Sequence, residues 1–320
     1  MDFELTPDQA ALQDAIRKQL AGRFPIEEIR GLQDRAGVDR GRWQELAQAG
    51  VFGLRLPESD GGVGLGLAEA VLVFEELGRA LVPGPLLATH LAAGLIEGAA
   101  DGSAVLGAVD RRIEPVLVEH LAALDALVVV DDAGLWLVEP RDVQAEAVAV
   151  PLDPLTPLHR AASLPTGAPL AGPDGAVAWA RDGAVLASAL QLGLAEATTD
   201  MAVAYAKERV QFDRPIGGFQ AVKHILADML VRSELARAAV YAAGVIIDVP
   251  EVGDADRAAS VAKILAGEAA LANAKACIQV HGGMGFTWEV DAHLYLKRAW
   301  VLDTVWGSAD AHASALAAAL

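Results

Sequence analysis

Residues 209–220, RVQFDRPIGGFQ, combine side chains that could bind a nucleotide. The guanidinium group of Arg209 could bind a pyrophosphate, the ring of Phe212 could lie against an adenine, and the amide of Gln220 could form hydrogen bonds with ring or ribose atoms. The same residue types also occur at ordinary helix corners, where the arginine lies on the surface and the phenylalanines pack. On residue types alone, an ordinary corner is the simpler interpretation.

A second stretch, HGGMGF at 281–286, follows a long predicted helix. Consecutive glycines such as Gly282 and Gly283 end a helix, and they also let a ligand approach the bare backbone. Taken alone, this pattern is explained by helix termination.

Other patterns exclude several kinds of site. GGVGLG at 61–66 lacks the spacing and the preceding strand of a dinucleotide fingerprint, so a flexible turn is expected there. None of the seven histidines pairs with a second ligand at metal-binding spacing, which predicts no metal site. Cys277 is the single cysteine, which excludes an intrachain disulfide, and it lies in an apolar helical pattern typical of a buried thiol.

The composition excludes several classes of partner. Of the 320 residues, 53% are apolar and 5% are aromatic, which favours long helices packed through small side chains. The formal net charge of -18 repels nucleic acid phosphates and anionic lipids, so neither nucleic acid nor a membrane is expected as a partner. Since the N-terminal MDFELTPDQ is not a secretion signal and no charge-free apolar run could cross a bilayer, we expect a cytoplasmic protein.

The elements that must position these residues are mostly helices. In TPDQAALQDAIRKQLAGRF, Thr6 is a capping residue before Pro7, and the spacing of the apolar residues predicts a helix. Further helices are predicted over roughly 41–49, 66–80 and 86–97. Residues 1–100 are therefore expected to form an N-terminal helical domain.

Two further segments complete the predicted organisation. Short apolar runs and turns between about 104 and 180 predict a small β unit, and the proline-rich stretch from Pro151 to Pro173 predicts an irregular linker, so 101–181 form a reduced middle domain. The last segment, 182–320, is expected to form a helical bundle, because long helical patterns with short connections return there. Its helices are predicted over roughly 184–208, 218–246, 253–280, 290–299 and 304–318.

Four stretches of the sequence match the motifs of one known family, in that family's order. They are MDFELTPDQAALQDAIRKQL, WQELAQAGVFGLRLPESDGGVGLGLAEAVLVFEELGRAL, YAKERVQFDRPIGGFQAVKHILADM and IQVHGGMGFTWEVDAHLYLKRA. Through these motifs the sequence resembles the acyl-CoA dehydrogenases. It implies a mainly α fold with an N-terminal helical domain, a middle β-domain and a C-terminal four-helix bundle. It also implies FAD as the cofactor, used to oxidise the Cα–Cβ bond of an acyl-CoA thioester.

The chain departs from the family where a catalytic base is expected. Most relatives carry the base as the Glu of a Tyr-Glu-Gly-Thr stretch, and Trp306 takes that place in VWGSAD. Some relatives supply the Glu from the start of the first bundle helix, where this chain has Gly183. The Thr-Glu-Pro and Trp-Ile-(Thr/Ser) segments that hold the flavin ring and the thioester are not found between Asp101 and Arg181. The resemblance therefore implies a truncated middle β-domain and no catalytic residue at the usual positions.

The motifs that bind the ADP half of FAD across a subunit interface are retained. In similar proteins these are an Arg-x-x-Phe…Gln corner and a Gln-x-x-Gly-Gly turn, matched here by Arg209, Phe212, Gln220, Gln279, Gly282 and Gly283. The chain therefore resembles the short subunit of a heteromeric acyl-CoA dehydrogenase of bacterial steroid catabolism, whose longer partner subunit carries the flavin ring and the catalytic Glu. An α2β2 assembly with one FAD per heterodimer and a bulky acyl-CoA substrate are implied.

Two alternatives remain at this point. In the first, the chain is self-sufficient and a relocated carboxylate acts as the base, with Glu139, Asp182 or Asp310 as candidates. Glu139 is the most interesting of these, because it closes an apolar run beside Pro140. Each of them is most simply a surface carboxylate. In the second, the chain is a structural relic that does not contact flavin.

Overall fold

The structure is a computed structural model that describes residues 4–33 and 37–319. The chain forms two compact units, each assembled from separate stretches of sequence. The bundle unit comprises Met1–Gly22, Val71–Val82 and Ala184–Leu320, and the sheet unit comprises Arg23–Ala70 and Pro83–Gly183. The division into 1–100, 101–181 and 182–320 stays a prediction.

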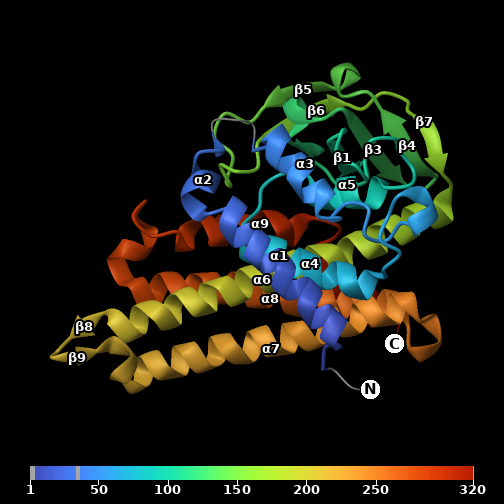
Figure 1. Ribbon diagram of the computed structural model, residues 1–320. Coiled ribbons are helices and arrows are strands. Elements are labelled where there is room, and N and C mark those ends of the chain that lie inside the picture. Colours follow the sequence, from blue (N-terminus) through green and yellow to red (C-terminus); the bar gives the residue numbers. More distant parts are fainter. Residues whose placement is uncertain (1–3, 34–36, 320) are drawn as a thin grey trace. The chain divides into compact units, whose positions relative to one another are not determined.

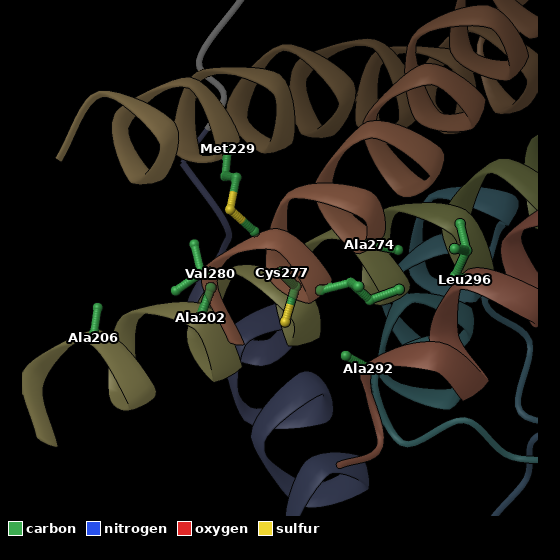
Figure 2. Close-up of a cluster of buried hydrophobic side chains, with 9 residues drawn as sticks. Ala202, Ala206, Met229, Ala274, Cys277, Val280, Ala292 and Leu296 are labelled. Atoms are coloured by element: carbon green, nitrogen blue, oxygen red, sulfur yellow. The ribbon is translucent and has the colours of Figure 1, made fainter. Parts of the chain in front are cut away.

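Long helices with a shared apolar core make up the bundle unit. Helices that contribute to it are α1 (Pro7–Arg23), α4 (Leu67–Arg79), α6 (Pro173–Glu208), α7 (Gln220–Asp248), α8 (Ala255–His281), α9 (Ala292–Thr304) and α10 (Ala309–Ala318). Figure 1 shows α7 and α8 as long helices lying side by side. Figure 2 shows one core cluster, in which Ala202 of α6, Met229 of α7, Cys277 of α8 and Leu296 of α9 are all buried. The four-helix arrangement expected for the C-terminal segment is thus present.

A buried amide lies among the apolar side chains of this core. Asn273 on α8 is fully buried, and its Nδ2 lies 2.9 Å from the carbonyl oxygen of Met229 on α7 and 3.2 Å from Oγ1 of Thr199 on α6. Its Oδ1 accepts a hydrogen bond of 2.9 Å from Nη1 of Arg232. Because a buried polar group is costly unless it is paired, these bonds favour one alignment of the three helices.

Helices α4 and α6 approach each other closely through two glycines. A Cβ atom on Gly78 would overlap the backbone of Leu190, and one on Gly193 would overlap the backbone of Glu75. Only glycine allows the two backbones to come this near.

Small β-sheets form the main part of the sheet unit. A four-stranded sheet has the order β1 (Leu106–Asp110), β3 (Ala126–Asp131), β4 (Gly134–Val138), β7 (Ala168–Ala171), with β1 and β3 parallel and the other pairs antiparallel. A three-stranded antiparallel sheet has the order β2 (Leu117–Glu119), β6 (Leu158–Ser163), β5 (Gln144–Ala147). Strand β3 is almost fully apolar and buried, as a central strand should be.

Shorter helices complete the architecture. In the sheet unit these are α2 (Ile26–Arg30), α3 (Arg40–Gln48) and α5 (Leu86–Ala92). Single 3₁₀ turns lie at Glu58–Asp60, Leu121–Ala123, Pro140–Asp142, Ile216–Gly218, Pro250–Val252 and Gly282–Phe286. None of the helices within the described ranges combines the length and the apolar character needed to cross a membrane.

Several expected elements are confirmed and others are wrong. Thr6 caps α1 through a reciprocal pair of bonds, Gln9 N to Thr6 Oγ1 at 3.2 Å and Thr6 N to Gln9 Oε1 at 3.1 Å. The irregular linker is wrong, because β6 and β7 both lie in it and α6 begins at Pro173. Proline is compatible with both elements: Pro169 lies on the edge strand β7, and the first turn of a helix needs no N–H donor. The helix expected over 304–318 is instead the end of α9, a turn at Val305–Ser308, and α10.

Candidate functional site

The segment expected to bind ADP is a hairpin between α6 and α7. Strands β8 (Val210–Gln211) and β9 (Arg214–Pro215) pair antiparallel, with Phe212 and Asp213 as the two connecting residues (Figure 1). Both connecting residues have left-handed backbone conformations, with φ of 52° and 59°, as a type I′ turn requires. A phenylalanine in this conformation is uncommon and costs about 1 kcal/mol or more.

The hairpin presents its side chains to the surface. The side chain of Phe212 is 87% exposed and meets the ring of Phe219 edge-on, at 6.0 Å between centroids. The guanidinium of Arg214 lies 4.1 Å above the ring of Phe219. Arg209 and Gln220 are also exposed, and neither side chain bonds to any described residue. The structure therefore leaves the polar groups of Arg209 and Gln220 available to a ligand.

The second expected motif is a turn at the end of α8. The helix ends at His281, Gly282 follows with φ of 63°, and both Gly282 and Gly283 are exposed. A Cβ atom on either glycine would meet nothing within 4 Å, so the backbone here faces open space. Gln279, in the last turn of α8, is exposed as well. This bare backbone is the kind of surface that a ligand can approach closely.

The structure brings the hairpin and the turn to the same end of the bundle. Tyr205, one turn before Arg209 on α6, stacks on His281 with 4.1 Å between ring centroids. Nδ1 of His281 in turn donates a hydrogen bond of 2.8 Å to the carbonyl oxygen of Cys277. The residues predicted from the two motifs are thus assembled on one unit, although they are separated in sequence.

The usual positions of the base hold no carboxylate. Trp306 lies between α9 and α10, half-buried, with φ of 56°. Its carbonyl oxygen accepts a hydrogen bond of 2.9 Å from Nε2 of His312, whose Nδ1 lies 3.1 Å from Oγ of Ser260. Gly183 lies in the interior of α6, ten residues after Pro173, and is buried. Neither position supplies a group that could remove a proton from substrate.

A buried lysine fixes the backbone just before Trp306. Nζ of Lys263 donates hydrogen bonds to the carbonyl oxygens of Leu302, at 2.9 Å, and Asp303, at 3.2 Å. Burial lowers the pKa of Lys263 to about 8, and the nearby charge of Asp303 opposes this shift. The side chain therefore stabilises the end of α9. The sequence places Lys263 in a helical pattern but gives no signal that it is buried.

The alternative carboxylates differ from one another in their surroundings. Glu139 is exposed, with Arg141 at 3.9 Å, so it does not close an enclosed cleft within the described part of the chain. Asp310 is exposed in the first turn of α10. Asp182 is buried and accepts a hydrogen bond of 2.9 Å from Nη1 of Arg55. The sequence did not indicate this ion pair, because its members are 127 positions apart.

Two family models match most of the chain. The acyl-CoA dehydrogenase N-terminal domain matches residues 6–101 and the C-terminal domain matches residues 180–320. The acyl-CoA dehydrogenase IpdE2 of Mycobacterium tuberculosis is 40% identical over 277 residues, which cover 82% of this chain and 81% of that protein. The chain belongs to the acyl-CoA dehydrogenase family. IpdE2 of Mycolicibacterium smegmatis is 34% identical to this family member, over 92% of the chain and 93% of its own length.

Solved structures of acyl-CoA dehydrogenases share the fold. A variant of the Tcur3481-Tcur3483 steroid ACAD is 27% identical, with a TM-score of 0.85 over 97% of both chains. The ChsE4-ChsE5 complex from Mycobacterium tuberculosis is 25% identical, with a TM-score of 0.83 over 99% of this chain and 98% of that chain. The expected mainly α acyl-CoA dehydrogenase fold is thereby confirmed.

Proposed function

We propose that this chain is a subunit of a heteromeric, FAD-dependent acyl-CoA dehydrogenase, to which it contributes the ADP-binding half of the FAD site. The active complex would introduce a double bond between Cα and Cβ of an acyl-CoA thioester. The observation that carries the proposal is the contrast between the two sites of this chain. The ADP-binding motifs are assembled and exposed, whereas both usual positions of the base lack a carboxylate.

The exposed residues fit the ADP half of FAD. Arg209 would bind the pyrophosphate, because its N–H donors are unused among the described residues and match the geometry of phosphate oxygens. The ring of Phe212 would lie against the adenine, which would remove a large apolar surface from water. Gln220 and Gln279 would form hydrogen bonds, and Gly282 and Gly283 would let the ligand reach the backbone.

The remaining chemistry is assigned to a longer partner subunit. When bound, FAD accepts the hydride that leaves the β-carbon of the acyl group. A carboxylate must remove the α-proton, and it has to lie within hydrogen-bond distance of that carbon. Since Trp306 and Gly183 cannot do this, the partner would supply the base, in an α2β2 assembly. The similarity to the Tcur3481-Tcur3483 steroid ACAD supports a bulky, steroid-derived acyl group. The similarity to the ChsE4-ChsE5 complex supports a heteromeric assembly.

Charge reversal at Arg209 tests the proposal. In the complex co-expressed with its partner, Arg209→Glu should reduce the FAD content severely, because the anionic pyrophosphate would face a carboxylate. Arg257→Glu is the matched control: Arg257 is an exposed arginine in the first turn of α8, about 40 Å along this helix from the turn at Gly282. Flavin absorbance per complex is the measurement. Equal FAD content in the Arg209→Glu complex and the wild type would contradict the proposed role and favour a structural relic.

The self-sufficient alternative predicts a different result for the chain expressed alone. It requires stoichiometric FAD on a homo-oligomer together with dehydrogenation of an acyl-CoA. The heteromer predicts a colourless chain without activity, which becomes active after the partner is added. Asp182 is the one relocated carboxylate with a buried setting, but its ion pair with Arg55 already occupies it.

A further inference from the structure

The sheet unit contains a cavity that the proposed FAD role does not use. Its volume is about 330 Å³, and all of its lining residues belong to this unit. Most of the lining is apolar and includes Phe52, Leu91, Leu135 and Trp179. The volume is within the range of sites that bind small molecules. None of the residues expected to bind ADP lines it.

One side of the cavity carries a charged pair. Nη1 of Arg55 donates a hydrogen bond of 2.9 Å to Oδ2 of Asp182, and both residues line the cavity. Nε of Arg181 lies 3.5 Å from the other oxygen of Asp182, so these three side chains carry a net positive charge. Positive charge is notable in a chain whose formal net charge is -18.

Arg55 has unused capacity to bind an anion. A guanidinium has five N–H donors, and within the described ranges the bond to Asp182 is the one hydrogen bond that Arg55 makes. Its side chain is 31% exposed, so the remaining donors are accessible. The other titratable lining residue, His90, is buried, and burial lowers its pKa to about 4, so it is uncharged at neutral pH.

The apolar wall also has a donor without an acceptor. Trp179 is 4% exposed, and its Nε1–H forms no hydrogen bond with any described residue. Buried donors are almost always paired in native proteins, by protein groups, water or a ligand. The wall thus combines aromatic surface with hydrogen-bonding capacity that the chain itself does not use.

We propose that this cavity binds a small carboxylate with a compact apolar body, its carboxylate held by Arg55 and its body packed against Phe52 and Trp179. A carboxylate matches the planar fork of an arginine better than a neutral group does. The apolar body would replace water along the aromatic and aliphatic walls. This site does not depend on the proposed FAD role, since it requires neither flavin nor a partner subunit.

Calorimetric titration with three probes tests the site. Adamantane-1-carboxylate has both the charge and the apolar body, adamantane-1-methanol has the body alone, and acetate has the charge alone. The 320-residue chain, in the assembly in which it is purified, should bind adamantane-1-carboxylate at one site per chain. The carboxylate should bind at least ~10-fold tighter than the alcohol at pH 7, since charge-assisted hydrogen bonds are the stronger ones. Acetate should bind weakest.

Variants assign the binding to the cavity. Arg55→Gln should weaken the binding of adamantane-1-carboxylate at least ~10-fold. The double variant Arg55→Gln/Asp182→Asn should do the same, and in it no carboxylate at position 182 has lost its hydrogen bond from Arg55. Ala178→Leu should weaken both acid and alcohol by filling the cavity, because Ala178 is a half-buried lining residue. Arg141→Gln, at an exposed arginine of the same unit, is the control and should bind like the wild type.

Three results would overturn the proposal. The first is an absence of saturable binding of adamantane-1-carboxylate up to millimolar concentration. The second is equal affinity for the acid and the alcohol. The third is wild-type affinity in the folded Arg55→Gln or Ala178→Leu variant, with folding checked by circular dichroism. If the Arg55 variants do not fold, the Ala178→Leu result decides.

Discussion

The buried carboxyl of Glu75 should make the stability of the bundle unit depend on pH. Glu75 on α4 is 2% exposed, and its Oε2 accepts a hydrogen bond of 2.7 Å from the hydroxyl of Tyr241 on α7. Burial raises the pKa of Glu75 to about 7 from its ordinary value of 4.5, while the bond from Tyr241 and the charge of Arg237 oppose the shift. At neutral pH this carboxyl is therefore held near its protonation midpoint.

The direction of the pH dependence follows from proton uptake. Between pH 4.5 and about 7, the folded state retains a proton on Glu75 that the unfolded chain has lost. The folded state thus binds more protons in this window, so the free energy of unfolding falls as the pH rises through it. Well above pH 7 the carboxyl is ionised in both the folded and the unfolded state. The difference between its two pKa values then corresponds to a loss of about 3 kcal/mol in the free energy of unfolding.

Glu75→Gln should remove this dependence. Glutamine has nearly the shape of the protonated carboxyl, and its amide oxygen can still accept the hydrogen bond from Tyr241. At pH 4.5 the variant should match the wild type in stability. At pH 8 it should be more stable by up to about 3 kcal/mol. Glu268→Gln, at an exposed position on α8, is the control and should follow the wild type at both values.

Urea unfolding followed by circular dichroism between pH 4.5 and 8 measures these differences. The quantity of interest is the stability of each variant minus that of the wild type at the same pH, which removes the pH dependence of all other groups. A constant difference for Glu75→Gln across the range would refute the reasoning, because it would mean that Glu75 titrates alike in the folded and unfolded states.

Two further predictions concern close packing in the bundle unit. Gly193→Ala should lower the melting temperature by several degrees, because the added Cβ overlaps the backbone of Glu75. Gly22→Ala is the control, because a Cβ there meets nothing within 4 Å. An unchanged melting temperature in Gly193→Ala would contradict the close approach of α4 and α6. Cys277 should resist alkylation by iodoacetamide in the folded protein at pH 8 and should react in urea. The reason is that its side chain is fully buried and that burial raises its pKa to about 12. Alkylation is measured by mass spectrometry, and rapid alkylation under native conditions would show that the core opens.

Local patterns in the sequence predicted much of the fold, because they depend on near neighbours. The cap formed by Thr6 and Gln9 could be read from four consecutive residues. The start of α6 could not be read from the sequence in the same way. Pro173 is equally compatible with a loop and with the first position of a helix. For the same reason β7 was missed, as the edge position that tolerates Pro169 is a property of the sheet and not of the segment.

The candidate site was predictable where it consists of contiguous motifs. Arg209, Phe212 and Gln220 could be recognised together, and the exposure of these side chains agrees with a role in binding. The groups missed are those whose setting is made by distant segments. Asp182 is recognisable from the sequence as a candidate base, but Arg55, which pairs with it, is 127 positions away. Glu75 lies in an ordinary helical pattern, and its unusual pKa arises from burial that no local pattern reports.

The amide of Asn273 has a consequence for the far end of the bundle. Its partners on α6 and α7 fix how far each helix is displaced along its length relative to α8. A shift of any one helix by a single turn, about 5 Å, would leave the buried amide without its hydrogen-bond partners on that helix. Together with the apolar core, these bonds therefore help to keep the hairpin after α6 and the glycines after α8 at the same end of the bundle. A core polar residue thus contributes to the alignment of the surface that we propose to bind the ADP half of FAD.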